Sequence, residues 1–329
     1  MLLTIAWRNI WRNRRRSLIV MLSIVVGVVF AMLSDGLSIG MIHQMLDNQI
    51  GSHVSHIQIH AKGYNDNQVI QNAIPDRRRV EEALDATAGV RHWSRRVTTF
   101  GLLSSALNSS GGLIVGVEPE REEAVTSIKA SIVEGTYLTG KPNEVVIGRR
   151  MAEKLGIGLG DKVVGMASAL NGDVGSDLFR VVGLYQTISS EFDKMHMFTL
   201  LSGLQGILEM EERVVEYAVI VDDIEQVDRV ASALRGYLGD DYEVLSYRDL
   251  LPMLVYMVDM YGQMMVVLYV VIGLAMVFGI INTMLMSVFE RIQEFGVLMA
   301  IGMKNSAVFR MVMAERSEER RVGKECRSR

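Results

Sequence analysis

The chain has 329 residues, of which 49% are hydrophobic, and its mean hydropathy is +0.22. Its charge is uneven: residues 35–259 carry 20 basic and 32 acidic side chains, a net of −12, whereas the whole chain has a net charge of −4. An acidic middle argues against nucleic-acid binding, which needs clustered lysine and arginine to displace counterions. The single cysteine, Cys326, excludes a disulfide within the chain and a zinc site made of cysteines.

Residues 1–16 predict a cytoplasmic amphipathic helix at a membrane surface. Two tryptophans share one helical face with aliphatic residues, and arginines surround the other face. Tryptophan and arginine together suit the headgroup level of a bilayer. We therefore predict five membrane-interface anchors: Trp7, Trp11, Arg14, Arg15 and Arg16.

Residues 17–38 are predicted as a first transmembrane helix. Ser17 to Ser34 is an uncharged run that is just long enough to cross a bilayer. The alternative is a cleaved signal peptide, but its apolar core would be shorter and no A-x-A cleavage pattern follows closely. The arginines before the span place the N-terminus in the cytoplasm and residues 39–260 on the far side.

The external residues predict a mixed α/β domain on two stalk helices. The first span continues as helix to Ile50, and Leu250–Gln263 leads as helix into the second span. Alternation and turn residues predict two β-α-β pieces and an inserted, mostly β lobe at about 120–210. The expected strands are 53–60, 97–107, 113–117, 144–147, 162–166, 178–185, 216–221 and 242–246, and the expected helices are 75–87 and 224–238.

Three local patterns resemble sites without meeting their requirements. The segment 135–141 fits most of a P-loop, but Pro142 replaces the serine or threonine that would bind Mg²⁺. The glycines at 156, 158 and 160 precede a strand, so they form a turn and not a dinucleotide site. The histidines at 53, 56 and 60 are too far apart along a strand to share a metal. We therefore expect no catalytic residue, cofactor or metal site.

Residues 261–289 are predicted as a second transmembrane helix. Asp259 and Glu290 bracket a long uncharged run that exceeds the length of one span. A short amphipathic helix follows at the membrane edge, with Phe295 and Gly302 on one face and Glu290 and Glu294 on another. A solvated helix end is the alternative interpretation.

The run E-R-x-x-E-x-G-x-x-x-A-x-G, from Glu290 to Gly302, resembles the coupling helix of ABC-transporter permeases of the FtsX/MacB type. This family includes the lipoprotein-releasing permeases LolC and LolE. The resemblance implies a two-lobed periplasmic core domain and a multi-pass protein of the bacterial inner membrane. It also implies that six residues contact a separate cytoplasmic ABC ATPase subunit: Glu290, Arg291, Glu294, Gly296, Ala300 and Gly302.

By the same resemblance, the protein itself is not an enzyme and works with a second permease subunit, in a homodimer or a heterodimer. It would transmit ATPase closure mechanically and move a lipoprotein or amphiphile from the outer leaflet. The family has four spans, so residues 290–315 would hold the coupling helix and the start of a missing third span. The composition changes abruptly at Arg316, which predicts a non-native tail at 316–329. The rival hypothesis is a two-span sensor or structural protein without an ATPase partner.

Overall fold

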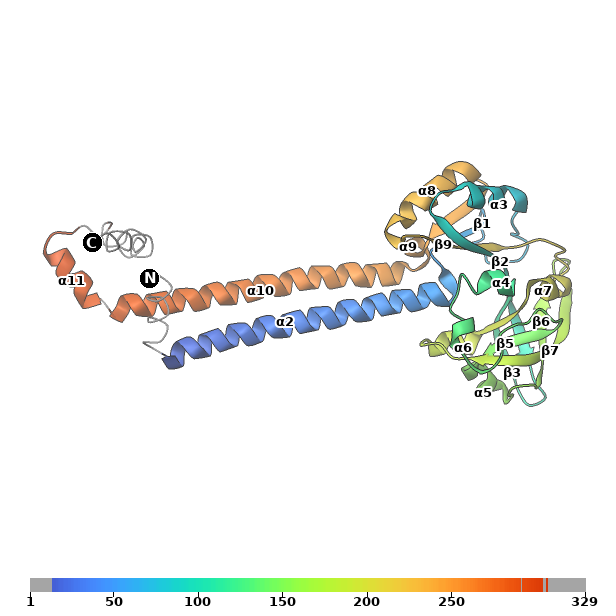
Figure 1. The fold of residues 1–329 in the computed structure, drawn as a ribbon, viewed down its shortest axis with the longest axis horizontal. Helices are drawn as coiled ribbons and strands as arrows, with labels where there is room; N and C mark the ends of the chain where they lie inside the picture. The colour runs from blue at the N-terminus through green and yellow to red at the C-terminus, as the bar shows by residue number, and fades with distance from the viewer. Residues whose placement is uncertain (1–13, 291, 304–305, 307–329) are drawn as a thin grey trace, which may run out of the picture. The chain divides into compact units, whose positions relative to one another are not determined.

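The computed structural model describes residues 14–290, 292–303 and 306 (Figure 1). The predictions for Trp7, Trp11, Arg291 and the tail at 316–329 lie outside these residues. The chain divides into two compact units, one of residues 1–40 with 258–329 and one of residues 41–257. Each unit is described by itself.

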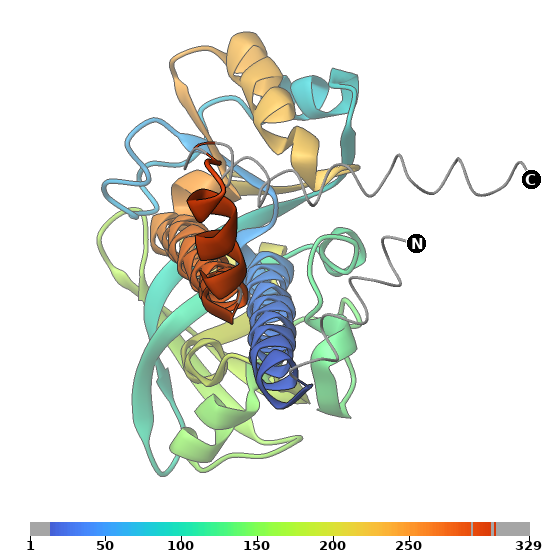
Figure 2. The ribbon, with the colours of Figure 1, turned by 90° about the vertical axis from the view of Figure 1, so that its left-hand side faces the viewer.

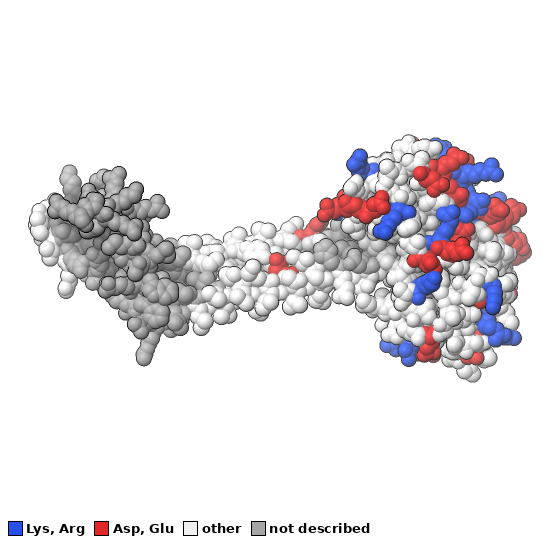
Figure 3. All heavy atoms as spheres, viewed as in Figure 1, with Lys and Arg blue, Asp and Glu red and all other residues white. Residues whose placement is uncertain are grey.

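Unit 1 is built on two long helices, α2 (Arg14–Gln49) and α10 (Pro252–Glu290). Each contains a segment that is long and apolar enough to cross a membrane, within 25–42 and 252–279. Within this unit the helices lie side by side, and Figure 3 shows few charged side chains on their described atoms. Tyr269 Oη donates a hydrogen bond to Asp35 Oδ2 at 2.9 Å and Tyr261 Oη donates to Oδ1 at 3.4 Å, so a carboxylate joins the two helices.

One part of unit 2 is a group of four paired strands in the order β10-β1-β9-β2. Its strands are β1 (Ile57–Ala61), β2 (Val90–Ser104), β9 (Glu216–Val221) and β10 (Tyr242–Ser246). Neighbouring strands are antiparallel, so β1 and β2 run parallel with β9 between them, as do β9 and β10 around β1. The helices α3 (Arg77–Ala86) and α8 (Val227–Leu238) complete two split β-α-β units and lie side by side (Figures 1 and 2).

The long strand β2 continues from this sheet into a closed ring of six strands. The ring order is β2-β3-β8-β5-β7-β6, and β6 returns to β2. Apolar side chains fill the ring, and a Cβ at Gly165 would lie only 2.9 Å from Phe179 Cε2, so the close packing requires glycine there. The strands are β3 (Ser109–Val117), β5 (Glu144–Gly148), β6 (Lys162–Ser168), β7 (Val174–Tyr185) and β8 (His196–Leu200).

Short elements cover one side of the ring. A second hydrophobic cluster contains Val115, Val146 and Phe198 from ring strands and Tyr137 and Phe192 from the segments that cover them. The outer surface of β3, β8 and β5 is therefore buried. The covering and connecting elements are α4 (Pro119–Glu122), η2 (Lys129–Ser131), β4 (Ile132–Gly135), α5 (Arg149–Leu155), α6 (Ser190–Met195) and α7 (Leu201–Ile207).

The structure confirms the mixed α/β class, the helix begun by Asp76 and the strands 216–221 and 242–246. It corrects three predictions. The strand expected at 53–60 begins only at Ile57, because residues 50–54 extend the helix as the π-helix η1 (Ile50–Val54). The strands expected at 97–107 and 113–117 lie at 90–104 and 109–117, so the turn between them lies at 105–108, and the strands β4 and β8 were missed.

The helix expected over Leu250–Gln263 is confirmed from Pro252, after a separate helical turn, α9 (Tyr247–Leu250). A mostly β lobe was expected within residues 120–210. The closed ring also contains β2 and β3, which lie before residue 120. The division into two lobes and the domain boundaries stay predictions.

Candidate coupling segment and domain base

The segment after α10 folds as the short helix α11 (Ile292–Ala300), where the sequence predicted an amphipathic helix. The helix ends at Gly302, whose φ of 101° lies in the left-handed region. Its amide donates to Met299 O at 3.0 Å and the amide of Ile301 donates to Val297 O at 3.1 Å. Glycine at 302 thus allows the backbone conformation that ends the helical path.

Within this segment Gly296 and Ala300 lie one helical turn apart and are both exposed. A Cβ at Gly296 would meet no heavy atom within 4 Å, so the surface is open there. Two small residues on one helix face let another backbone approach closely. Glu290 ends α10 and Glu294 lies on α11, but both side chains, like the whole of Arg291, are outside the described set.

The domain base is the segment where α2 enters unit 2, and a buried arginine holds it. Arg96 on β2 is fully buried, and its Nη1 donates to His53 O of η1 at 2.5 Å. The same guanidinium contacts Glu122 Oε1 at 2.8 Å and Glu216 Oε1 at 2.7 Å. Burial lowers the pKa of Arg96, but the two carboxylates raise it more, so the net shift is upward and the side chain stays charged.

Two further contacts fasten the same segment to the domain. Ser127 donates from its amide and from Oγ to Gly51 O, at 2.7 and 3.1 Å. The amide of Tyr247 donates to His56 O at 2.9 Å, which links the residues just after η1 to the chain that returns toward α10. The end of α2 is therefore held by several separate segments of unit 2.

Two histidines with lowered pKa values lie in an aromatic cluster beside Arg96. The ring centroids of His53 and His196 are 5.3 Å apart, and Phe192 stacks on His196 at 3.9 Å. Burial lowers the pKa of His196 to about 4, opposed by its hydrogen bond to Phe192 O and aided by the charge of Arg96. Burial and then Arg96 also lower the pKa of His53. Both imidazoles are neutral at pH 7.

The described residues contain no group of three histidine, cysteine or carboxylate side chains that could hold a metal ion. His56 accepts a hydrogen bond from the Val221 amide at 3.0 Å, and His60 lies 2.9 Å from Val215 O. The P-loop-like segment 135–141 leads into strand β5 and not into a helix, so it lacks the helix N-terminus that a phosphate site needs.

Sequence reasoning missed the Arg96 cluster. Arg96 lies among other polar residues of β2, so nothing in the local sequence marked it, and its partners lie 26 and 120 residues away along the chain.

Comparison with known proteins supplies the family. Residues 17–237 match the family model described as MacB-like periplasmic core domain, and residues 266–316 match the FtsX-like permease C-terminal model. No curated protein matches the chain.

Two solved structures resemble the chain at 14% sequence identity. The extracellular domain of the noncanonical ABC-type transporter YknZ from Gram-positive bacteria has a TM-score of 0.42 and aligns over 58% of this chain and 100% of its own. The periplasmic region of MacB from Actinobacillus actinomycetemcomitans has a TM-score of 0.44 and aligns over 64% and 97%.

The two family models cover residues 17–237 and 266–316, which include most of α2, the strands β1 to β9, and α10 from residue 266 onward. Proteins of this family are membrane-embedded permease components of ABC transporters, carry a periplasmic domain and are not themselves enzymes. The chain therefore belongs to the family of the MacB-like periplasmic core domain, as an FtsX/MacB-type permease-like protein of ABC-type transporters.

Proposed function

We propose that the chain is the permease subunit of a mechanotransmission transporter that moves a lipoprotein or another amphiphile from the outer leaflet of the inner membrane. The observation that carries this proposal is the match of residues 266–316 to the FtsX-like permease C-terminal model. That match includes α11, and the run Glu290–Gly302 within it resembles the coupling helix of permeases of the FtsX/MacB type, which include LolC and LolE.

In this proposal α11 is the docking element for a separate cytoplasmic ATPase. The exposed small residues Gly296 and Ala300 accept close approach of a partner backbone, and Glu290 and Glu294 are charged members of the same sequence run. Arg291 and Gly302 complete the predicted contact set. The N-terminus and α11 are cytoplasmic, the domain is periplasmic, and a second permease subunit completes the transporter.

Movement of the ATPase would reach the domain through α2 and α10. The helical hydrogen bonding of α2 passes into η1, which Arg96 and Ser127 hold by its carbonyl groups. A segment that is fixed at several points transmits a displacement with little loss, because packed interiors have low compressibility. The buried cluster around Arg96 is thus the point where the domain would receive the movement.

The test is co-purification of the full chain with the ATPase from its own source organism. The amount of ATPase that co-purifies with the variant Glu290→Lys/Glu294→Lys should fall by about tenfold or more relative to the unchanged chain. Charge reversal places like charges across an interface. The matched control is Glu82→Lys/Glu225→Lys, two exposed domain residues with the same change of charge, which should retain the ATPase normally.

Normal co-purification of the Glu290→Lys/Glu294→Lys variant would refute the coupling role. If no ATPase binds the unchanged chain, the two-span sensor becomes the better hypothesis.

A further inference from the structure

The strands β2, β6 and β7 present an exposed apolar surface on the outside of the ring. Side chains alternate between the two faces of a strand, and Leu103, Val163 and Phe179 point inward and are buried. Their outward neighbours stay exposed, at 60% for Phe100, 43% for Leu102 and 43% for Leu178. We call six outward residues the outer apolar face: Phe100, Leu102, Val164, Met166, Val174 and Leu178.

The strand register makes this face continuous. Leu102 on β2 is opposite Met166 on β6, and Val164 on β6 is opposite Leu178 on β7. Cross-strand partners have Cβ atoms about 5 Å apart, so these side chains touch or nearly touch. On the other side of the ring, aromatic residues cover the corresponding surface. The outer apolar face is an uncovered half of the same ring.

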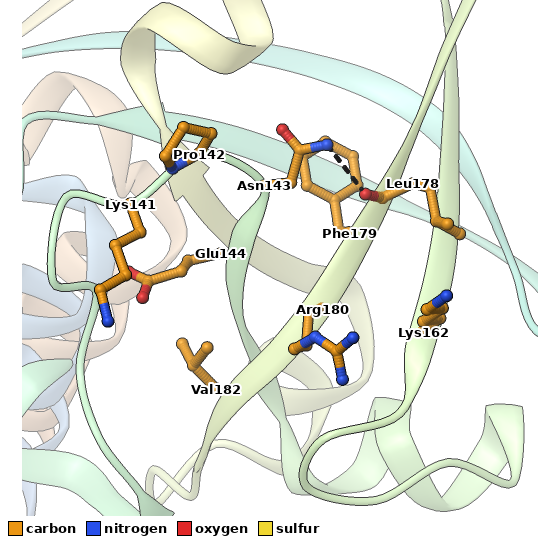
Figure 4. Close-up of a pocket in the computed structure, with 9 residues that line it drawn as sticks. All are labelled: Lys141, Pro142, Asn143, Glu144, Lys162, Leu178, Phe179, Arg180 and Val182. Carbon is orange, nitrogen blue, oxygen red and sulfur yellow. Dashed lines mark hydrogen bonds between the residues drawn. The ribbon is translucent and has the colours of Figure 1, made fainter.

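The face ends in a cationic hollow. The next cross-strand pair along β6 and β7 is Lys162 opposite Arg180. These two residues and Lys141 line a cavity of about 430 Å³ together with Leu178 and Val182. Figure 4 shows Lys141 on one side of the hollow and Lys162 on the other, with Arg180 between them.

Among the described residues, the three cationic side chains of the hollow form no ion pair. The guanidinium of Arg180 donates to Gly160 O, at 3.0 Å. The wall residue Glu144 is buried and accepts from the amide and hydroxyl of Thr139 at 2.6 and 2.7 Å. Three cationic side chains thus line one hollow in a segment, residues 35–259, whose net charge is −12.

We infer that the cationic hollow and the outer apolar face form one binding site for a monomeric amphiphile with an acidic head group. The head group binds Lys162, Arg180 and Lys141, and the hydrocarbon chain lies across Leu178, Val164, Met166 and Leu102. The hollow has the size of small-molecule pockets in proteins. The site is inferred from the domain alone and does not rest on the proposed coupling to an ATPase.

A protein strand fits this site less well than an amphiphile. The backbones of β2, β6 and β7 pair with one another inside the ring, so this surface is a sheet face and offers no free edge for an added strand. A flat membrane surface also fits poorly, because these cations line a hollow together with apolar side chains.

The experiment uses the full chain in nanodiscs of phosphatidylcholine and a photoreactive probe, dodecanoic acid with a diazirine at the end of its chain. After irradiation, mass spectrometry maps the labelled peptides. Label is expected in peptides that contain Leu102, Met166 or Leu178. Label in α2 and α10 serves as the internal reference, because any hydrocarbon probe that enters the bilayer reaches those helices.

The variant Lys162→Glu/Arg180→Glu should reduce the domain label by about tenfold or more, because charge-assisted contacts to the acid are lost. Lys162→Gln/Arg180→Gln should give a smaller loss and serves if the first variant folds poorly. The matched control Lys154→Glu/Arg229→Glu changes two exposed cations away from the hollow and should label normally. The label in α2 and α10 should be equal in all variants.

A second probe, dodecanol with the same diazirine, separates head-group recognition from simple hydrophobic contact. Weak domain labelling by the alcohol supports the inference. Equal labelling by acid and alcohol, or unchanged labelling of both hollow variants, overturns it. Binding to phosphatidylglycerol vesicles without domain labelling by the acid also overturns it and identifies a membrane-contact surface.

Discussion

Arg96 Nη2 lies 2.8 Å from Glu122 Oε1, and both side chains are fully buried. The pair joins strand β2 to helix α4, and through His53 O it also holds η1. A buried ion pair contributes little net stability when it is compared with a well-packed apolar pair, but breaking it leaves an uncompensated charge. The cluster therefore specifies how η1 sits on the domain.

The variant Glu122→Gln should destabilise the domain by about 3 kcal/mol, because removal of one partner of a buried pair typically costs 3–5 kcal/mol and Glu216 still faces Arg96. Chemical denaturation of the full chain in nanodiscs measures the change. The control is Arg150→Ala, which breaks the exposed ion pair with Glu153 and should cost less than about 1 kcal/mol. Equal losses in the two variants would contradict the structural role of the cluster.

Acid should weaken the domain through His196. Its folded-state pKa of about 4 lies below the ordinary value of 6.5, so the unfolded chain binds the proton first. The stability from the neutral imidazole is fully present above pH 6.5 and is lost as the pH falls toward 4. Denaturation of the full chain at pH 7.5 and pH 5 measures this loss.

The variant His196→Phe keeps an aromatic ring against Phe192 and cannot be protonated. It should lose less stability between the two pH values than the unchanged chain does. His92→Ala, at an exposed histidine, should behave like the unchanged chain. If His196→Phe retains the full pH dependence, another group is responsible for it.

Local signals in the sequence predicted the elements that local chemistry determines. Asp76 accepts hydrogen bonds from the amides of Arg78 and Arg79, as expected of a helix N-cap, and the alternating residues of 216–221 form a strand. The spacing of Gly296 and Ala300 on one helix is equally local. These features required no knowledge of the rest of the fold.

Features that depend on distant pairing could not be predicted in this way. Strand β8 has five buried residues and no alternation, so its sequence lacks the period of a half-buried strand. Closure of the ring depends on β6 pairing with β2, and the outer apolar face is recognisable only from that register. Residues 50–54 remained helical because Ser55, with a φ of 57°, ends the helical path later than expected.

The hydrogen bond from Tyr269 to Asp35 should stabilise the packing of α2 against α10. Tyr269→Phe removes the donor at 2.9 Å and should cost about 0.6 kcal/mol, up to about 1.7, the range for hydrogen bonds between membrane helices. Tyr261→Phe, at 3.4 Å, should cost less. Unfolding of the full chain in nanodiscs measures both, with the exposed Tyr256→Phe as control. A loss from Tyr256→Phe as large as that from Tyr269→Phe would refute this role.

Gly296 and Ala300 leave open space on one face of α11. Gly296 is helical and a Cβ there meets no neighbour, so Gly296→Leu should not weaken the helix and should stabilise it by up to about 1 kcal/mol. If a partner backbone lies against Gly296 and Ala300, the leucine blocks its approach, and co-purification of the ATPase should fall by about tenfold.

The control is Val297→Leu, which adds bulk at an exposed neighbouring position on the same helix. A stable Gly296→Leu protein that retains as much ATPase as Val297→Leu would place the docking surface elsewhere. Loss of the ATPase in Gly296→Leu alone would separate docking from folding, because the substitution favours the helix while it removes the space that a partner needs.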